Sequence, residues 1–152
     1  VLHHTGNMWT ALDNVIELVK PGGMLAISIY NDQRRRSQLW RAVKRTYNRG
    51  WFGRAAVIAV FVPLFAILAA VADLSHGRNP TAQYREYRRR RGMSRVHDWL
   101  DWLGGYPFEV ARPDVIFNFY KRRGFALRQL ITVGGSLGCN QFVFIRRETP
   151  AA

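Results

Sequence analysis

The fold is decided by one stretch of the sequence, Lys20-Pro21-Gly22-Gly23-Met24-Leu25-Ala26-Ile27-Ser28-Ile29-Tyr30. Proline followed by glycine predicts a turn, because proline interrupts a helix and glycine readily adopts the positive φ that ends one. The segment from Met24 to Tyr30 is almost entirely apolar and is closed by Asn31-Asp32. This pattern predicts a strand buried on both faces of a parallel sheet.

The segment before this turn predicts a helix over residues 8–19, with Asn7 as its N-cap. We interpret Val1-Leu2 as the end of an earlier buried strand, and His3-His4-Thr5-Gly6 as the polar loop after it. One face of the helix must be covered, because its apolar residues recur at helical spacing. These residues are Met8, Leu12, Val15, Ile16 and Val19.

The C-terminal segment predicts a helix and two strands. Arg112-Pro113 starts a helix that ends before Gly124, and strands are expected over 125–133 and 140–146. The glycine-rich connection at 134–138 has hairpin size, and because it joins two strands it does not predict a phosphate-binding loop. The order of elements predicts the second half of a doubly wound α/β sheet with an antiparallel edge pair.

Three parts of the chain follow from these patterns. We expect a sheet core that combines residues 1–32 with residues 110–152, interrupted by a helical insert or lid over 33–109. Within the insert, Leu39, Trp40, Val43 and Tyr47 are spaced as the apolar face of an amphipathic helix.

The positive charge of the chain is concentrated in the insert. The chain has 152 residues and a formal net charge of +13, and eight basic residues without an acid lie within 33–54. Seven more lie within 78–95, against Glu86 alone. Such arms suit an anionic membrane, the phosphates of a nucleic acid, or a solvated surface. No nucleic-acid-binding motif is present, and the adjacent apolar run favours lipid or a greasy substrate held under a lid.

That apolar run, residues 55–72, has no polar side chain and contains Pro63. We favour buried or interfacial packing, the buried form being a helical hairpin that bends at the proline, with membrane insertion as the alternative. A single membrane span would place the strand before the run and the strands after it on opposite sides of the bilayer. If these strands share one sheet, the run must re-enter, lie in the interface, or bend back.

The sequence resembles the C-terminal half of a class I S-adenosylmethionine-dependent methyltransferase. The resemblance rests on Val1-Leu2-His3-His4-Thr5, on Leu18-Val19-Lys20-Pro21-Gly22-Gly23 before a strand, and on Arg123-Gly124-Phe125. It covers about 1–32 and 110–147, and it implies a partial Rossmann-like sheet running from the end of strand four to strand seven. The glycine-rich cofactor loop and the acidic ribose ligand of that family would lie upstream, so we expect this chain to be a piece of a longer protein.

The resemblance also implies where the site lies. In the family the loop after strand four borders the methionine end of S-adenosyl-L-methionine and the substrate, which makes Leu2, His3 and Thr5 the candidate cofactor contacts. Ligands of open α/β sheets bind at the carboxyl ends of strands, so Tyr30 and Asn31 are candidate substrate contacts. The further candidates Tyr106 and Glu109 line either a substrate pocket or a structural corner.

Histidine is the usual proton acceptor near neutral pH, so His3 and His4 are the candidate catalytic bases. Because they are adjacent, we expect their side chains to diverge and at most one to face the site; alternatively one caps a turn and the other is solvated. Two adjacent histidines without a third ligand do not predict a metal site. His97, Asp98 and Asp101 form either a second polar cluster or one face of a short helix whose tryptophans pack inward.

We therefore expect the C-terminal part of an S-adenosylmethionine-dependent methyltransferase that acts on a small, in one reading lipophilic, molecule. The alternative is a non-catalytic interaction domain that associates with a membrane surface through residues 33–95. The single cysteine, Cys139, excludes an internal disulfide. With no signal-peptide pattern at its start, the chain is expected in the cytoplasm, with peripheral membrane attachment as the variant.

Overall fold

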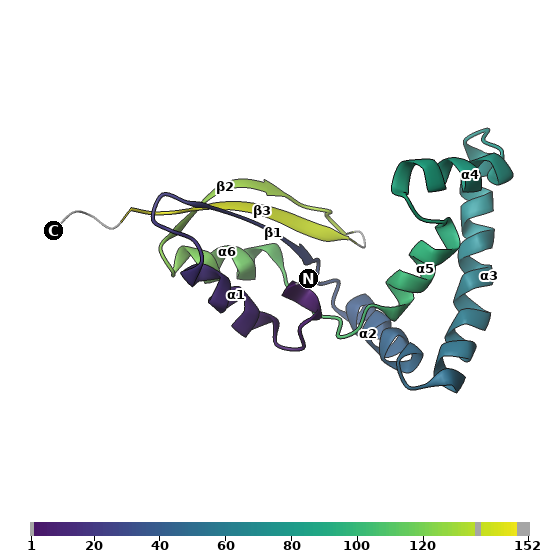
Figure 1. Cartoon of the computed structure of the whole chain (residues 1–152), viewed down its shortest axis with the longest axis horizontal. Helices are drawn as coiled ribbons and strands as arrows, with labels where there is room; N and C mark the ends of the chain where they lie inside the picture. Colours follow the sequence, from purple (N-terminus) through teal and green to yellow (C-terminus); the bar gives the residue numbers. More distant parts are fainter. Residues whose placement is uncertain (1, 136–137, 149–152) are drawn as a thin grey trace. The chain divides into compact units, whose positions relative to one another are not determined.

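The computed structural model describes residues 2–135 and 138–148 (Figure 1). Its elements in chain order are the 3₁₀ turn η1 (Leu2–His4), α1 (Met8–Glu17), β1 (Met24–Tyr30), α2 (Arg35–Tyr47), α3 (Trp51–Ser75), α4 (Pro80–Arg91), α5 (Arg95–Gly104), α6 (Pro113–Lys121), β2 (Phe125–Ile131) and β3 (Cys139–Arg146). The protein is thus a mixed helix-and-strand chain. The bounds of β1 match the prediction to the residue.

Two compact units divide the described chain. The sheet unit comprises the residues up to Leu39 together with those from Pro107 onward, and the helical unit is Trp40–Tyr106. Helix α2 begins in the first unit and ends in the second. The helical unit lies within the predicted insert 33–109.

The sheet unit is built on three strands in the order β1-β3-β2. Strand β3 runs antiparallel to both neighbours, so β1 and β2 are parallel to each other. Its pairing with β1 is continuous, from Met24 opposite Ile145 to Tyr30 opposite Cys139. The predicted antiparallel strand pair is therefore confirmed, and it lies directly beside β1.

Helices α1 and α6 cover one face of this sheet (Figure 1). The core between them contains fully buried side chains from both helices and from the strands: Leu12, Ile29, Ile116, Tyr120 and Phe144. On the other face of β1, Met24, Ala26 and Ser28 are exposed. The prediction that β1 is buried on both faces is therefore wrong for the described chain, because β1 alternates as strands do when one face is solvated.

Local signals explain where α1 begins and how the chain turns into β1. Asn7 caps α1 with its side chain, which accepts a hydrogen bond from the Thr10 backbone N–H, as predicted. Gly22 has a φ of +74°, a conformation that a residue with a Cβ rarely adopts. The predicted end of strand four is not observed, since Leu2 lies in η1 and Val1 is outside the described residues.

The helical unit has its own core. Tyr47, Val57 and Leu103 are buried there, and aromatic side chains surround them, including Trp40, Phe61, Phe65 and Trp102. Phe65 contacts both Trp99 and Trp102 of α5, with ring centroids 5.9 and 6.0 Å apart. The interpretation of residues 97–102 as a short helix with inward tryptophans is therefore confirmed.

Helix α3 runs without interruption from Trp51 to Ser75 and contains Pro63 in its interior. The predicted hairpin with its bend at Pro63 is wrong. One side of α3, including Val57, Phe61 and Phe65, packs within the helical unit on both sides of the proline, and this continuous packing holds the two halves in one helix. Among the described residues α3 is the one helix long and apolar enough to cross a membrane, and 6% of its most apolar stretch is buried.

Lys44 is part of a predicted basic arm, yet its side chain is fully buried in the helical unit. Its ammonium group donates a hydrogen bond to the Trp102 carbonyl and lies 4.1 Å from the centroid of the Trp102 ring. A cation at the last carbonyls of α5 is favourable for the helix dipole. Burial lowers the pKa of Lys44 to about 8, and Asp101 partly opposes this shift.

Candidate functional site

The carboxyl end of β1 carries an aromatic cluster that we call the strand-end cluster: His3, His4, Tyr30 and Phe108. The Tyr30 ring centroid lies 4.3 Å from that of His3, 5.6 Å from that of His4 and 5.1 Å from that of Phe108. These residues come from three segments, η1, the last residue of β1 and the chain that leaves the helical unit. The cluster therefore exists only in the folded sheet unit.

Backbone hydrogen bonds bring the third segment to β1. The Ala111 N–H donates to the Tyr30 carbonyl, and the Glu109 N–H donates to the His3 carbonyl, at 3.0 and 3.1 Å. Asn31 and Ala111 form a parallel bridge. Residues 107–111 thus run beside the end of β1 and place Phe108, which is 4% exposed, against Tyr30.

Each histidine has one ring nitrogen on a backbone carbonyl. His3 Nδ1 lies 3.1 Å from the Ser28 oxygen, and His4 Nδ1 lies 2.6 Å from the Pro107 oxygen. A carbonyl only accepts, so in each neutral ring Nδ1 carries the proton and Nε2 is the proton acceptor. The two histidines differ in burial, because His3 is buried and His4 is half-buried.

Burial makes His3 a weak base. Together with the neighbouring His4, which acts in the same direction, burial lowers the pKa of His3 to about 4. His3 is therefore neutral at physiological pH and accepts a proton poorly. His4 is the better candidate for proton transfer, since its ring is more accessible and its tautomer is fixed by Pro107.

The expectation that the two histidine side chains diverge is wrong. Their ring centroids are 4.5 Å apart at an interplanar angle of 60°, and both rings contact Tyr30. The reason is that His3 and His4 lie in a 3₁₀ turn rather than in an extended loop. Successive side chains then differ by about 120° instead of pointing to opposite sides.

The Glu109 side chain interacts with the N-terminus of α1. Its carboxylate accepts hydrogen bonds from the backbone N–H groups of Gly6 and Met8, at 2.9 and 3.0 Å. A helix N-terminus has unpaired N–H groups and a partial positive charge, so a carboxylate there stabilises the helix. Glu109 was considered as part of either a substrate pocket or a structural corner. These hydrogen bonds are contacts of the structural kind.

Two of the three other candidate residues, Thr5 and Asn31, make structural contacts. Thr5, which directly follows η1, donates a hydrogen bond to the Leu2 carbonyl. The Asn31 side chain donates to the Gly134 carbonyl at 2.7 Å and accepts from Asn140 at 3.1 Å, which ties the end of β1 to the β2–β3 connection. Tyr106 lies in the helical unit, where it is 41% exposed.

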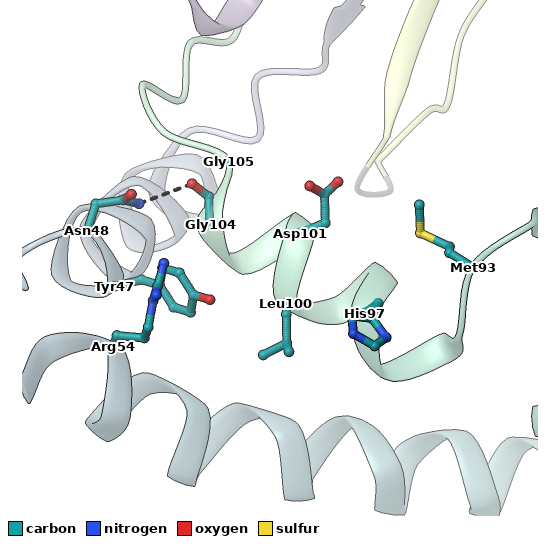
Figure 2. A pocket seen from close by; sticks show the side chains of 9 residues that line it. All are labelled: Tyr47, Asn48, Arg54, Met93, His97, Leu100, Asp101, Gly104 and Gly105. Atoms are coloured by element: carbon teal, nitrogen blue, oxygen red, sulfur yellow. Dashed lines mark hydrogen bonds between the residues drawn. The ribbon is translucent and has the colours of Figure 1, made fainter. Parts of the chain in front are cut away.

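A separate pocket of about 510 Å³ lies within the helical unit (Figure 2). It is lined by Tyr47, Asn48, Arg54, Met93, His97, Leu100, Asp101, Gly104 and Gly105. Several of its polar groups hold the unit together: Asn48 donates to the Gly104 carbonyl at 3.1 Å, and His97 Nδ1 lies 2.6 Å from the Ser94 hydroxyl. Asp98 bonds to Tyr87 and Arg91 of α4, so the structure does not gather His97, Asp98 and Asp101 as a single polar cluster.

Sequence reasoning missed Phe108 and the Pro107 carbonyl as parts of the cluster. The available signal was the run Gly104-Gly105-Tyr106-Pro107-Phe108-Glu109, whose glycines and proline mark a chain reversal. Its partner at the start of the chain is visible only in the fold.

The described residues contain no group of three or more His, Cys, Asp or Glu side chains arranged to hold a metal ion. In comparisons with known proteins, no family model, curated protein or solved structure matches this chain.

The cap that Glu109 provides leads to a first prediction. Glu109→Ala should lower the free energy of unfolding by about 1–2 kcal/mol, because two N–H groups at the start of α1 lose their acceptor. Urea unfolding of the purified protein measures this. Glu17→Ala is the matched control, since Glu17 is exposed near the other end of α1. Equal stability of the two variants would show that the carboxylate does not act as a cap.

The buried His3 leads to a second prediction. Its pKa of about 4 in the folded state is lower than the ordinary value of 6.5, so the unfolded chain takes up a proton first as the pH falls. Stability should therefore decrease between about pH 6.5 and pH 4, by about 3 kcal/mol at pH 4. His3→Asn keeps a donor for the Ser28 carbonyl and does not titrate. The stability difference between wild type and His3→Asn should change over this range, and a constant difference would contradict the assignment.

Proposed function

We propose that this chain is the C-terminal part of an S-adenosylmethionine-dependent methyltransferase whose acceptor is a small molecule with a hydroxyl or amine group. The observation that supports this most is the strand-end cluster. It combines an aromatic wall, Tyr30 and Phe108, with a half-buried histidine whose Nε2 is left as a proton acceptor. The cluster lies at the carboxyl end of β1, where open α/β sheets bind ligands.

As part of this proposal, we infer that the three strands form the edge of a Rossmann-like sheet. Support comes from the parallel direction of β1 and β2 and from helices α1 and α6, each of which precedes its strand and covers the same face. In this reading β3 is the antiparallel edge-region strand that the resemblance implies.

The proposal gives this chain only the part of the cofactor site that borders the methionine end, the candidate contacts Leu2, His3 and Thr5. In support, Leu2 and His3 lie in η1, and the Thr5 hydroxyl is bonded to the Leu2 carbonyl. No glycine-rich turn in the described chain leads from a strand into a helix: Gly22-Gly23 precedes β1, and Gly134-Gly135 follows β2. The proposal therefore assigns the glycine turn and the ribose contact to residues upstream, and the acceptor side of the site to this chain.

S-adenosyl-L-methionine, when bound, supplies an electrophilic methyl group. The role of this chain is to deprotonate the acceptor and to shield it from water. His4 Nε2 takes the proton that a hydroxyl or amine loses, while the Nδ1–H bond to Pro107 fixes the ring. Tyr30 and Phe108 form a wall that excludes water from one side. His3, neutral and buried, positions Tyr30 by ring contact.

The third prediction concerns His4 in the complete encoded polypeptide that contains this chain. His4→Asn retains a side-chain N–H for the Pro107 carbonyl and removes the Nε2 acceptor. We expect turnover to fall about 100-fold or more, because a positioned base typically contributes that much. Release of S-adenosylhomocysteine with a panel of small hydroxyl and amine compounds measures turnover.

The matched control is His76→Asn. His76 is an exposed histidine of the helical unit whose Nδ1 also lies near a backbone carbonyl, 2.7 Å from the Ala72 oxygen. It should leave turnover unchanged. Full activity of His4→Asn would remove His4 from the reaction. If calorimetry detects no binding of the cofactor to the complete polypeptide at about 1 mM, the proposed function itself is wrong.

A second candidate, a non-catalytic domain attached to a membrane surface, is favoured by one observation, the exposed apolar side of α3. Membrane attachment does not exclude catalysis. Cofactor binding distinguishes the two candidate functions, because a methyltransferase requires it and a non-catalytic membrane domain does not.

A further inference from the structure

Helix α3 has two sides with different surroundings. One side packs in the helical unit through Val57, Phe61 and Phe65. The other side is exposed and consists of large apolar residues spaced three or four positions apart. We call this the α3 outer face: Val60, Leu64, Ile67, Leu68, Val71 and Leu74, which are 42–64% exposed.

The charges of α3 do not lie on this face. Its acid, Asp73, is 5% exposed and forms an ion pair with Arg95 of α5 at 2.8 Å. Arg54, near the N-terminal end of α3, lies over the Tyr47 ring at 5.0 Å. At the same end Trp51 and Phe52 are exposed and stack on each other, with centroids 3.6 Å apart. Exposed aromatic residues at the end of an apolar helix are typical of the membrane–water interface.

We propose that the α3 outer face docks on an anionic lipid surface, with α3 lying in the interface and not crossing the bilayer. This inference does not depend on methyl transfer. Contiguous apolar surfaces of this kind mark interaction sites, because monomeric proteins rarely leave them in water. A helix that is apolar on all sides needs a partner on each, and the helical unit supplies a partner on one side only.

Charge favours lipid over a second copy of this chain. The helical unit contains 12 basic and 4 acidic residues, a net charge of +8. Two such units repel each other, whereas anionic lipid attracts each nearby basic residue. The four consecutive arginines Arg88–Arg91 that end α4 are all exposed, and so are Arg45 and Arg49 before α3.

The sheet excludes a single crossing of the membrane. Strand β1 precedes α3 and β3 follows it, and the two strands pair along their length. If α3 crossed, the chain would have to return through the hydrocarbon in α4 or α5. Helix α4 has five arginines in twelve residues, so it cannot serve as a return span. Helix α5 has 10 residues, about 15 Å at 1.5 Å per residue, which is half the thickness of the hydrocarbon. An orientation along the surface, with the outer face in the lipid, satisfies both constraints.

The test is vesicle flotation of the full chain with Ile67→Glu/Val71→Glu, two changes on the outer face. Both positions are exposed, 61% and 58%, so folding should be unaffected, and circular dichroism checks this. Leu18→Glu/Met24→Glu is the matched control, because these residues are also apolar, are at least as exposed (84% and 62%), and lie in the sheet unit. Phosphatidylcholine vesicles with and without phosphatidylglycerol are the probes.

We expect wild type and control to float with the phosphatidylglycerol vesicles, and the outer-face variant to bind them about 10-fold more weakly or worse. Four substitutions of Arg88–Arg91 by Gln should weaken binding and reduce its dependence on salt. Three results would overturn the proposal: no flotation of the wild type, unchanged flotation of the outer-face variant, or a lipid-free dimer that the outer-face substitutions dissociate. Salt-dependent binding to DNA without binding to vesicles would assign the arginines to nucleic acid instead.

Discussion

The pairing of β1 with β3 is the interaction on which the other features depend. It joins residues 24–30 to residues 139–145 across the entire helical unit, with an unbroken antiparallel register. Because β3 also pairs with β2, this one strand links the N-terminal and C-terminal parts into a single sheet, and α1 and α6 gain a common surface to cover. The chain is therefore forced to return to the end of β1 after α5. The returning segment, 107–111, contributes Phe108, the Pro107 carbonyl and the Glu109 cap.

The two apolar regions of the protein differ in how far they are covered. In the sheet unit the apolar side chains form a closed core. In the helical unit α3 is closed on one side only, and the chain on either side of it is bound to one sheet. An apolar helix in this position has the length of a membrane span, about 37 Å at 1.5 Å per residue over 25 residues, but not its freedom to cross. Most of the excess positive charge lies in the same unit as this helix, whereas the strand-end cluster lies in the sheet unit.

The parts of the fold that the sequence predicted are those decided by neighbours along the chain. The bounds of β1, the Asn7 cap and the turn at Gly22 depend on residues within a few positions. What it missed depends on distant contacts. The Glu109 carboxylate accepts a hydrogen bond from the Met8 N–H, 101 positions away in the chain. Pro63 stays within a helix because Phe61 packs on α2 and Phe65 packs on both α2 and α5. The histidines were identified from their chemical type and the resemblance, but their contact with each other follows from the η1 turn, which the expected strand end did not predict.

Strands β1 and β3 share one sheet, so both must lie on the same side of any membrane that α3 contacts. Single cysteines at Arg36 and Arg122, in a Cys139→Ser background, report on this directly, because both arginines are exposed in the sheet unit and α3 lies between them in the chain. The measurement is labelling by a membrane-impermeant maleimide in inside-out vesicles from cells that express the chain. We predict that both cysteines react at the same rate before detergent is added. Protection of one cysteine until the vesicles are dissolved would place the two strands on opposite sides and contradict the shared sheet.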